Sequence, residues 1–173
     1  MRYHIQWNTY GSWLPGDPRG FRTKGHRMHV EGDYRNPPPK GTYDNLKAYV
    51  QSHMNKEEVI IPPDLRPAVG NACLEQFGIE DVYVYKLSVG GQHVHVAIDC
   101  LPDGLKQMIG RIKKVSSHRV RDQLPGKVWS HGCNIVTVRD EQHWRNVLNY
   151  IADHARNSWV WLGQDPDHHP HLP

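Results

Sequence analysis

Two histidines separated by one residue, His93 and His95, are the side chains in this sequence best placed for chemistry. They lie in the segment 92–99, where polar and apolar residues alternate strictly. Alternation of period two predicts a β-strand, and both imidazoles then point to the same side, about 7 Å apart along the backbone. This placement suits two neighbouring metal ligands. Two polar residues on a solvated sheet face would give the same pattern.

A tyrosine and a histidine four residues apart, Tyr150 and His154, form a second candidate pair. The segment from Asp140 to about Asn157 has apolar residues at helical spacing, and Asp140 is a suitable N-cap. Residues four apart lie on the same face of a helix, and this face borders the expected buried stripe. Taken alone the pair is a weak signal, because a tyrosine at the border of a core is common.

Together these residues suggest a defined chemistry. Three neutral imidazoles, His93, His95 and His154, can hold a divalent cation, and Tyr150 lies one helical turn from the third. Phosphodiester cleavage by a tyrosine nucleophile uses these parts. Tyrosine is a poor nucleophile near neutral pH because its ordinary pKa is about 10, and a metal can withdraw charge from the phosphate and help the leaving oxygen depart. A covalent tyrosine–DNA bond keeps the phosphodiester energy, so rejoining needs no ATP.

The elements that must position these residues form a mixed pattern of strands and helices. The sequence predicts strands over 3–10, 82–89, 92–99 and 133–138, and helices with apolar stripes over about 42–54, 64–77, 103–122 and 140–157. Their order reduces to βαββαβ, the ferredoxin-like split pattern. We therefore expect an α+β fold with an antiparallel sheet, helices on one face, the other face free to bind a ligand, and a C-terminal helix that carries the tyrosine.

The dipeptide Gly90-Gly91 predicts a two-residue hairpin turn before the histidine strand. That turn would pair Ser88 with His93 and Lys86 with His95, which puts Lys86 on the imidazole face. The helix over 103–122 carries further basic residues, and we expect it to bring positive charge beside the site.

Length and composition limit the number of domains, the possible partners and the class of protein. The 173 residues fit one domain over 1–160, with a long Gly- and Pro-rich loop at about 15–41 and a flexible tail over 161–173. The net charge of +3 permits a polyanionic partner without requiring one. The three widely spaced cysteines indicate neither a disulfide framework nor a zinc knuckle. No apolar run approaches membrane-spanning length, so we expect a cytoplasmic protein with no membrane partner.

The order and spacing of several motifs resemble the single-tyrosine HUH transposases, including insertion-sequence transposases and the REP-associated tyrosine transposases. The motifs that carry the likeness are His93-Val94-His95, the basic segment from Gly110 to Arg119, the segment from Trp129 to Asn134, Tyr150, and the opening segment from Tyr10 to Gly20. The likeness spans most of the chain, from about Tyr3 to His154.

The resemblance implies roles for these residues. His93 and His95 would bind Mg²⁺ or Mn²⁺, and Tyr150 would be the nucleophile that leaves a 5′-phosphotyrosine and a free 3′ hydroxyl. The substrate would be single-stranded DNA, often with hairpin-containing repeats. His154 replaces the glutamine frequent at its position, and histidine can still act as a ligand. The expected phosphate contacts are Arg19, Arg22, Lys86, Arg111, Lys113, Lys114 and Arg119. Whether the protein is a monomer or a homodimer, with Tyr150 acting in its own subunit or across the dimer, stays open.

Other classes of protein fit less well. Histidine-triad nucleotide hydrolases need a third histidine at the position of Ala97, which disfavours them. A single-strand-binding sheet would use exposed aromatics for stacking, but Tyr83 and Tyr85 are expected on the face opposite the histidines. A domesticated, non-cleaving protein that binds single-stranded DNA hairpins is the remaining alternative.

Overall fold

The computed structural model describes residues 1–17 and 39–163. Arg19, Arg22, most of the predicted loop and the end of the predicted tail lie outside the described residues. The chain divides into two compact units. One comprises Met1–Tyr10 with Ile60–Pro173, and the other comprises Gly11–Val59. The candidate histidines and Tyr150 all belong to the first unit.

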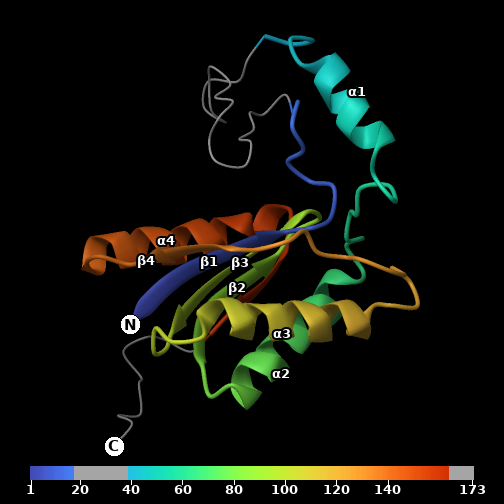
Figure 1. The fold of residues 1–173 in the computed structure, drawn as a ribbon. Coiled ribbons are helices and arrows are strands. Elements are labelled where there is room, and N and C mark those ends of the chain that lie inside the picture. Colours follow the sequence, from blue (N-terminus) through green and yellow to red (C-terminus); the bar gives the residue numbers. More distant parts are fainter. Residues whose placement is uncertain (18–38, 164–173) are drawn as a thin grey trace, which may run out of the picture. The chain divides into compact units, whose positions relative to one another are not determined.

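A five-stranded antiparallel sheet forms the centre of the first unit (Figure 1). Its order is β4-β1-β3-β2-β5. The strands are β1 (Arg2–Asn8), β2 (Tyr83–Val89), β3 (His93–Asp99), β4 (Asn134–Thr137) and β5 (Trp159–Leu162). The predicted α+β class with an antiparallel sheet is confirmed. The edge strand β5 was not predicted. It comes shortly after the segment interpreted as the last helix, and its residues Trp161 and Leu162 fall in the segment that was expected to be a flexible tail.

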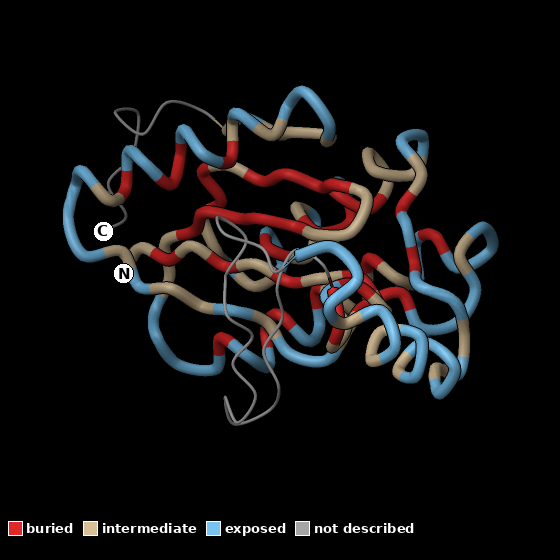
Figure 2. The backbone as a smooth tube through the Cα atoms, turned by 90° about the horizontal axis from the view of Figure 1, so that it is seen from above, coloured by how far each residue is buried: buried red, intermediate tan, exposed pale blue. Residues whose placement is uncertain are grey.

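Helices cover both faces of this sheet. Figure 1 shows α2 (Arg66–Ile79) and α3 (Leu105–Arg119) on one side and α4 (Glu141–Asp153) on the other. The expectation that one face stays free is therefore wrong. Side chains alternate across a strand, so β3 directs Val94, Val96 and Ile98 to the α2/α3 side and its histidines to the α4 side. Figure 2 shows the result, with the central strands buried along most of their length.

The hairpin register differs from the predicted one. The Gly90 amide donates to the carbonyl of His93, which makes Gly91 and Gln92 the turn residues. Ser88 consequently pairs with His95 and Lys86 with Ala97, two residues away from the predicted partners. The reason is tertiary. The carbonyls of the two turn residues accept hydrogen bonds from the Ile61 and Thr9 amides, contacts that no local turn signal reveals.

A β-bulge between Val84 and Lys86 reverses the predicted direction of two tyrosines. Beyond the bulge Tyr83 pairs with Asp99, which shares a face with the histidines, and Tyr85 packs on α4. The prediction that Tyr83 and Tyr85 face away from the histidines is therefore wrong. An extra residue on one strand changes which side the following side chains take, and strict alternation cannot anticipate it.

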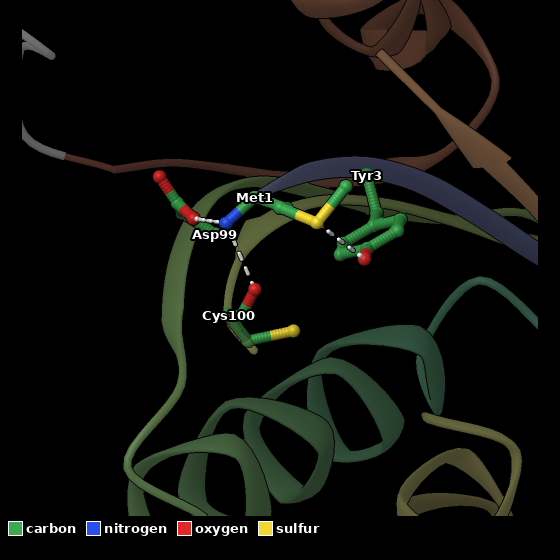
Figure 3. Close-up of polar contacts among 4 residues, drawn as sticks. All are labelled: Met1, Tyr3, Asp99 and Cys100. Carbon is green, nitrogen blue, oxygen red and sulfur yellow. Dashed lines mark hydrogen bonds and ion pairs between the residues drawn. The ribbon is translucent and has the colours of Figure 1, made fainter. Parts of the chain in front are cut away.

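The start of β1 is fixed to the end of β3 (Figure 3). The α-amino group of Met1 donates to the Asp99 carboxylate at 2.6 Å and to the Cys100 carbonyl at 2.9 Å. The Tyr3 hydroxyl lies 3.5 Å from the Met1 sulfur. These contacts support the β1–β3 register, in which His4 pairs with Ala97 and Gln6 with His95.

The second unit contains α1 (Asp44–Ser52), which was expected to bury an apolar face but has no buried residue. Two glycines of the opening segment let the chain approach neighbouring backbone. A Cβ at Gly11 would lie 2.7 Å from Glu58, and one at Gly16 would lie 2.5 Å from the Lys47 amide nitrogen. Both glycines have positive φ angles. In the described part of the chain, no helix is long and apolar enough to cross a bilayer.

We expect Gly70→Ala to destabilise the protein. Gly70 lies in α2 against the indole of Trp159 in β5, where a Cβ would come within 1.9 Å of ring carbon Cζ3. Overpacking of this kind costs about 1–3 kcal/mol, which exceeds the roughly 1 kcal/mol that alanine gains over glycine in a helix. Urea unfolding of wild type and Gly70→Ala measures the difference in the free energy of unfolding.

Gly110→Ala in α3 is the matched control, because a Cβ there meets nothing within 4 Å. It should stabilise the protein by up to about 1 kcal/mol. If Gly70→Ala raised the free energy of unfolding as much as Gly110→Ala does, the packing of β5 on α2 would be contradicted.

Candidate functional site

Three histidines converge where β3 meets the end of α4. His93 and His95 lie on β3, and His154 opens the short 3₁₀ helix η2 (His154–Arg156) that continues α4. One ring nitrogen from each lies within 4.8 Å of the others. The ring centroids are 5.0 Å apart for His93 and His95 and 4.9 Å apart for His95 and His154. Two segments that are distant in the sequence thus bring three nitrogen donors to one point.

The rotation of α4 about its axis decides where His154 lies. Asp140 begins the helix as predicted, since its carboxylate accepts a hydrogen bond from the His143 amide at 2.7 Å. The apolar stripe then packs on the sheet beside Ala97 and Tyr85; its members are Trp144, Val147, Leu148 and Ile151. Ala97 is fully buried, and its small side chain lets the helix approach. With the stripe buried, Tyr150 and His154 emerge at its border.

Tyr150 lies beside the three histidines and remains accessible. Its ring centroid is 5.2 Å from that of His95 and 4.6 Å from that of His154. The residue is nevertheless 48% exposed. A group that touches the site on one side and solvent on the other can meet a substrate that approaches from outside.

The tautomer of His154 follows from its hydrogen bond. Its Nδ1 lies 2.7 Å from the backbone carbonyl oxygen of Tyr150. A carbonyl only accepts, so Nδ1 carries the proton and Nε2 of the neutral ring keeps its lone pair. That nitrogen is available to a metal.

A fourth histidine, His4 on β1, belongs to the same cluster and was missed by the sequence analysis. Its Nε2 lies 3.1 Å from Nδ1 of His95, and the two rings stack with centroids 5.3 Å apart. The centroid of the Tyr150 ring lies 5.9 Å from that of the His4 ring. The alternation of β1 does put His4 on the polar face of its strand, but only the pairing of β1 with β3 shows that this face is the histidine face.

Burial keeps two of these rings neutral. Desolvation, followed by the proximity of His93, His4 and His154, lowers the pKa of His95 to about 2. Desolvation also lowers the pKa of His4 to about 4, with smaller effects of His143 and His154. A neutral imidazole can donate a lone pair to a cation, so the electrostatics at neutral pH favour metal binding.

Gly90, next to the hairpin turn, lies against the ring of His93. A Cβ at this position would lie 3.2 Å from Nε2 of His93 and 3.2 Å from the Ser158 hydroxyl oxygen. The absence of a side chain therefore gives the His93 ring its space.

Four of the predicted phosphate contacts lie on α3, away from the histidines, whereas Lys86 pairs with Ala97 and so shares the histidine face as predicted. The helix α3 lies on the opposite face of the sheet (Figure 1), so the expectation that it places charge beside the site is wrong. Arg111 donates to Glu80 at 2.6 and 2.7 Å, and Arg119 pairs with Glu75 at 2.5 Å. Lys113 donates to the Ser130 and Gly132 carbonyls, and Lys114 is exposed. The apolar stripe of α3 determines this position, because it packs under the apolar face of the sheet. DNA contacts by these residues and by Lys86 remain predictions.

The metal-free protein should lose stability on acidification. His4 and His95 stay neutral in the folded chain, whereas in the unfolded chain they take up protons near the ordinary value of 6.5. The unfolded state therefore binds more protons below that pH, and the free energy of unfolding falls as the pH drops toward the folded values. For His95 alone the loss between about pH 7.5 and about pH 5 is about 2 kcal/mol.

Urea unfolding at these two pH values measures the effect. The free energy of unfolding of His95→Phe should depend less on pH than that of wild type. Equal pH dependence of His95→Phe and wild type would contradict the predicted proton uptake.

Comparison with known proteins places the chain in a family. The family model of the IS200-like transposases matches residues 42–154, a range that contains His93, His95, Tyr150 and His154. No curated protein sequence matches the chain. Among solved structures, a putative transposase from Deinococcus radiodurans is 13% identical, with 88% of this chain and 89% of that chain covered and a TM-score of 0.47. A REP-associated tyrosine transposase bound to a REP hairpin is 11% identical, with 90% and 67% covered and a TM-score of 0.48. On the strength of the family match, this chain belongs to the IS200-like transposase family.

Proposed function

We propose that this protein is a metal-dependent single-stranded DNA endonuclease and strand transferase, and that Tyr150 is its nucleophile. The observation that carries the proposal is the position of Tyr150, in ring contact with His95 and His154 yet about half exposed. Membership in the IS200-like transposase family supports a transposase-like activity on DNA.

His93, His95 and His154 fit a divalent metal ion. Their donors are all imidazole nitrogens and lie within 4.8 Å of one another. Nitrogen donors suit transition metals better than Mg²⁺, which prefers oxygen ligands and keeps several waters. Mn²⁺ is therefore the better choice of the two ions for a test. When bound, the ion would withdraw charge from the scissile phosphate and help the leaving oxygen depart.

The proposed reaction is a transesterification on phosphorus. The Tyr150 oxygen attacks, the bond between that oxygen and phosphorus forms, and the bond from phosphorus to the 3′ oxygen breaks. The phenol proton passes to a base, and the leaving oxygen takes a proton to become a 3′ hydroxyl. The 5′ phosphate stays on Tyr150. Rejoining is the reverse attack by a 3′ hydroxyl, and it needs no ATP because the number of phosphodiester bonds is conserved.

Single-stranded DNA with a hairpin is the proposed substrate. The segment from Tyr10 to Gly20 resembles the opening of the REP-associated subgroup, which supports a hairpin signal. The site is formed by residues of one chain, so the proposed chemistry does not require Tyr150 to come from a second subunit. Whether the protein forms a homodimer is a separate question.

A binding module without cleavage is less well supported than an enzyme. Tyr83 and Tyr85 share the α4 side of the sheet, but the partly buried Tyr83 packs against the same cluster as Tyr85, and Tyr85 is only 3% exposed and packs edge-on against Trp144. A ring that is buried beneath a helix cannot stack on a base. The alternative is therefore a domesticated protein that binds DNA hairpins by other contacts.

Tyr150→Phe should abolish covalent attachment to DNA. The substitution removes only the nucleophilic oxygen, so binding of the same DNA should change by less than about 1.5 kcal/mol, the net contribution of one hydrogen bond. The measurement is a denaturing gel of protein incubated with a labelled single-stranded DNA pool and Mn²⁺, together with a binding assay.

Tyr49→Phe is the matched control, because Tyr49 is an exposed tyrosine on α1. It should form the adduct as wild type does. A covalent adduct with Tyr150→Phe would refute the assignment of the nucleophile, and an absence of adduct with wild type would favour the non-cleaving alternative.

His93→Ala and His95→Ala should each remove cleavage and weaken Mn²⁺ binding by at least about tenfold, since loss of a ligand costs no less than loss of the groups that orient ligands. Calorimetric titration with Mn²⁺ measures the affinity. His118→Ala on the opposite face of the sheet serves as control. Equal Mn²⁺ affinity in wild type and both site variants would mean that the metal binds elsewhere.

A further inference from the structure

The proposed reaction assigns no role to His4, although this side chain contacts His95. His4 sits directly across from Ala97 in the β1–β3 pairing, and Gln6 sits across from His95. Since Ala97 carries only a methyl group, the His4 ring can reach diagonally toward His95, its neighbour on the same face. The result is the 3.1 Å contact between Nε2 of His4 and Nδ1 of His95.

The chemistry of two neutral imidazoles restricts this contact. Each ring has one N–H donor and one lone pair, so one of the two facing nitrogens must donate and the other accept. If Nδ1 of His95 donates, its Nε2 has the lone pair that a metal needs. If Nδ1 of His95 accepts, its Nε2 carries the proton and cannot bind a cation. The direction of one hydrogen bond therefore decides whether His95 is a competent ligand.

We propose that His4 is a positioning residue that accepts the Nδ1 proton of His95 and thereby presents Nε2 of His95 to the metal. The proposal rests on the proposed function, because it presupposes that His95 is a ligand. In proteins, a metal-bound histidine almost always donates its other ring N–H to an oriented acceptor. His154 already shows this arrangement with the Tyr150 carbonyl, and His4 supplies the acceptor for His95.

His4 itself is not placed as a ligand. Within residues 1–17 and 39–163, the donors that gather within 4.8 Å are those of His93, His95 and His154. Nε2 of His4 faces Nδ1 of His95 instead. The His4 ring also stacks on His95 and meets the edge of Tyr150. It therefore fixes the orientation of the His95 ring as well as its tautomer.

The test combines tautomer analysis and metal affinity. ¹⁵N NMR of the histidine rings in metal-free wild type should show His95 protonated at Nδ1 and unprotonated at Nε2. In His4→Phe, which keeps a flat ring but no acceptor, His95 should shift toward the Nε2-protonated form. Mn²⁺ affinity of this variant, measured by calorimetry, should fall about 10- to 100-fold.

His4→Gln tests rescue, because the glutamine carbonyl can accept the same proton. It should restore much of the Mn²⁺ affinity and the Nδ1-protonated form of His95, which a purely structural role for His4 would not explain. His118→Phe is the control for loss of a histidine elsewhere and should match wild type. If His4→Phe fails to fold, the wild-type spectrum and His4→Gln still decide the question.

The outcomes separate this proposal from the proposed function. Equal Mn²⁺ affinity in wild type and His4→Phe would overturn the role of His4 while the metal site stands. A wild-type His95 protonated at Nε2 would overturn the role of His4 and would also leave His95 without a lone pair at Nε2 for a metal. A wild type that binds no Mn²⁺ would overturn the metal site, and with it the role of His4 as an aid to metal binding. In that case an Nδ1-protonated His95 would show only that the hydrogen bond has the expected direction.

Discussion

The site depends on the packing of the α4 stripe onto Ala97 and Tyr85. Burying a large apolar side chain contributes about 1.5–3 kcal/mol, so Trp144, Leu148 and Ile151 bind the helix firmly to the sheet. In a helix of 3.6 residues per turn, fixing the buried stripe fixes every other side chain. The directions of Tyr150 and His154 are a consequence of this packing. The hydrophobic contact thus determines the geometry of the polar site.

The proposed nucleophile Tyr150 and His154 form one structural unit. His154 donates through Nδ1 to the carbonyl of Tyr150, so the backbone that carries the tyrosine also sets the tautomer of the histidine. A movement of the last turn of α4 would shift both residues together relative to β3. His93 and His95, in contrast, are held by a central strand with neighbours on both sides. The proposed metal therefore links a rigid strand to the end of a helix.

The basic residues of α3 do not mark the candidate site, because α3 lies on the face of the sheet opposite the histidines (Figure 1). Two basic side chains of α3 form ion pairs, Arg119 with Glu75 on α2 and Arg111 with Glu80 just after α2. On the histidine face, burial keeps His4 and His95 neutral. Neutral rings leave lone pairs available, which matters more for this chemistry than net charge.

Local sequence patterns determined the α+β class, the histidine strand and the N-cap of α4, because alternation, helical spacing and capping act over a few residues. They also singled out His93, His95, Tyr150 and His154. The bulge before Lys86 and the position of the hairpin turn escaped them, since one extra residue reverses a face and distant amides hold the turn. The pairing of β1 with β3 decided where His4 lies. The apolar side of the sheet decided on which face α3 packs. Such contacts join residues far apart in the chain, and only the tertiary structure brings them together.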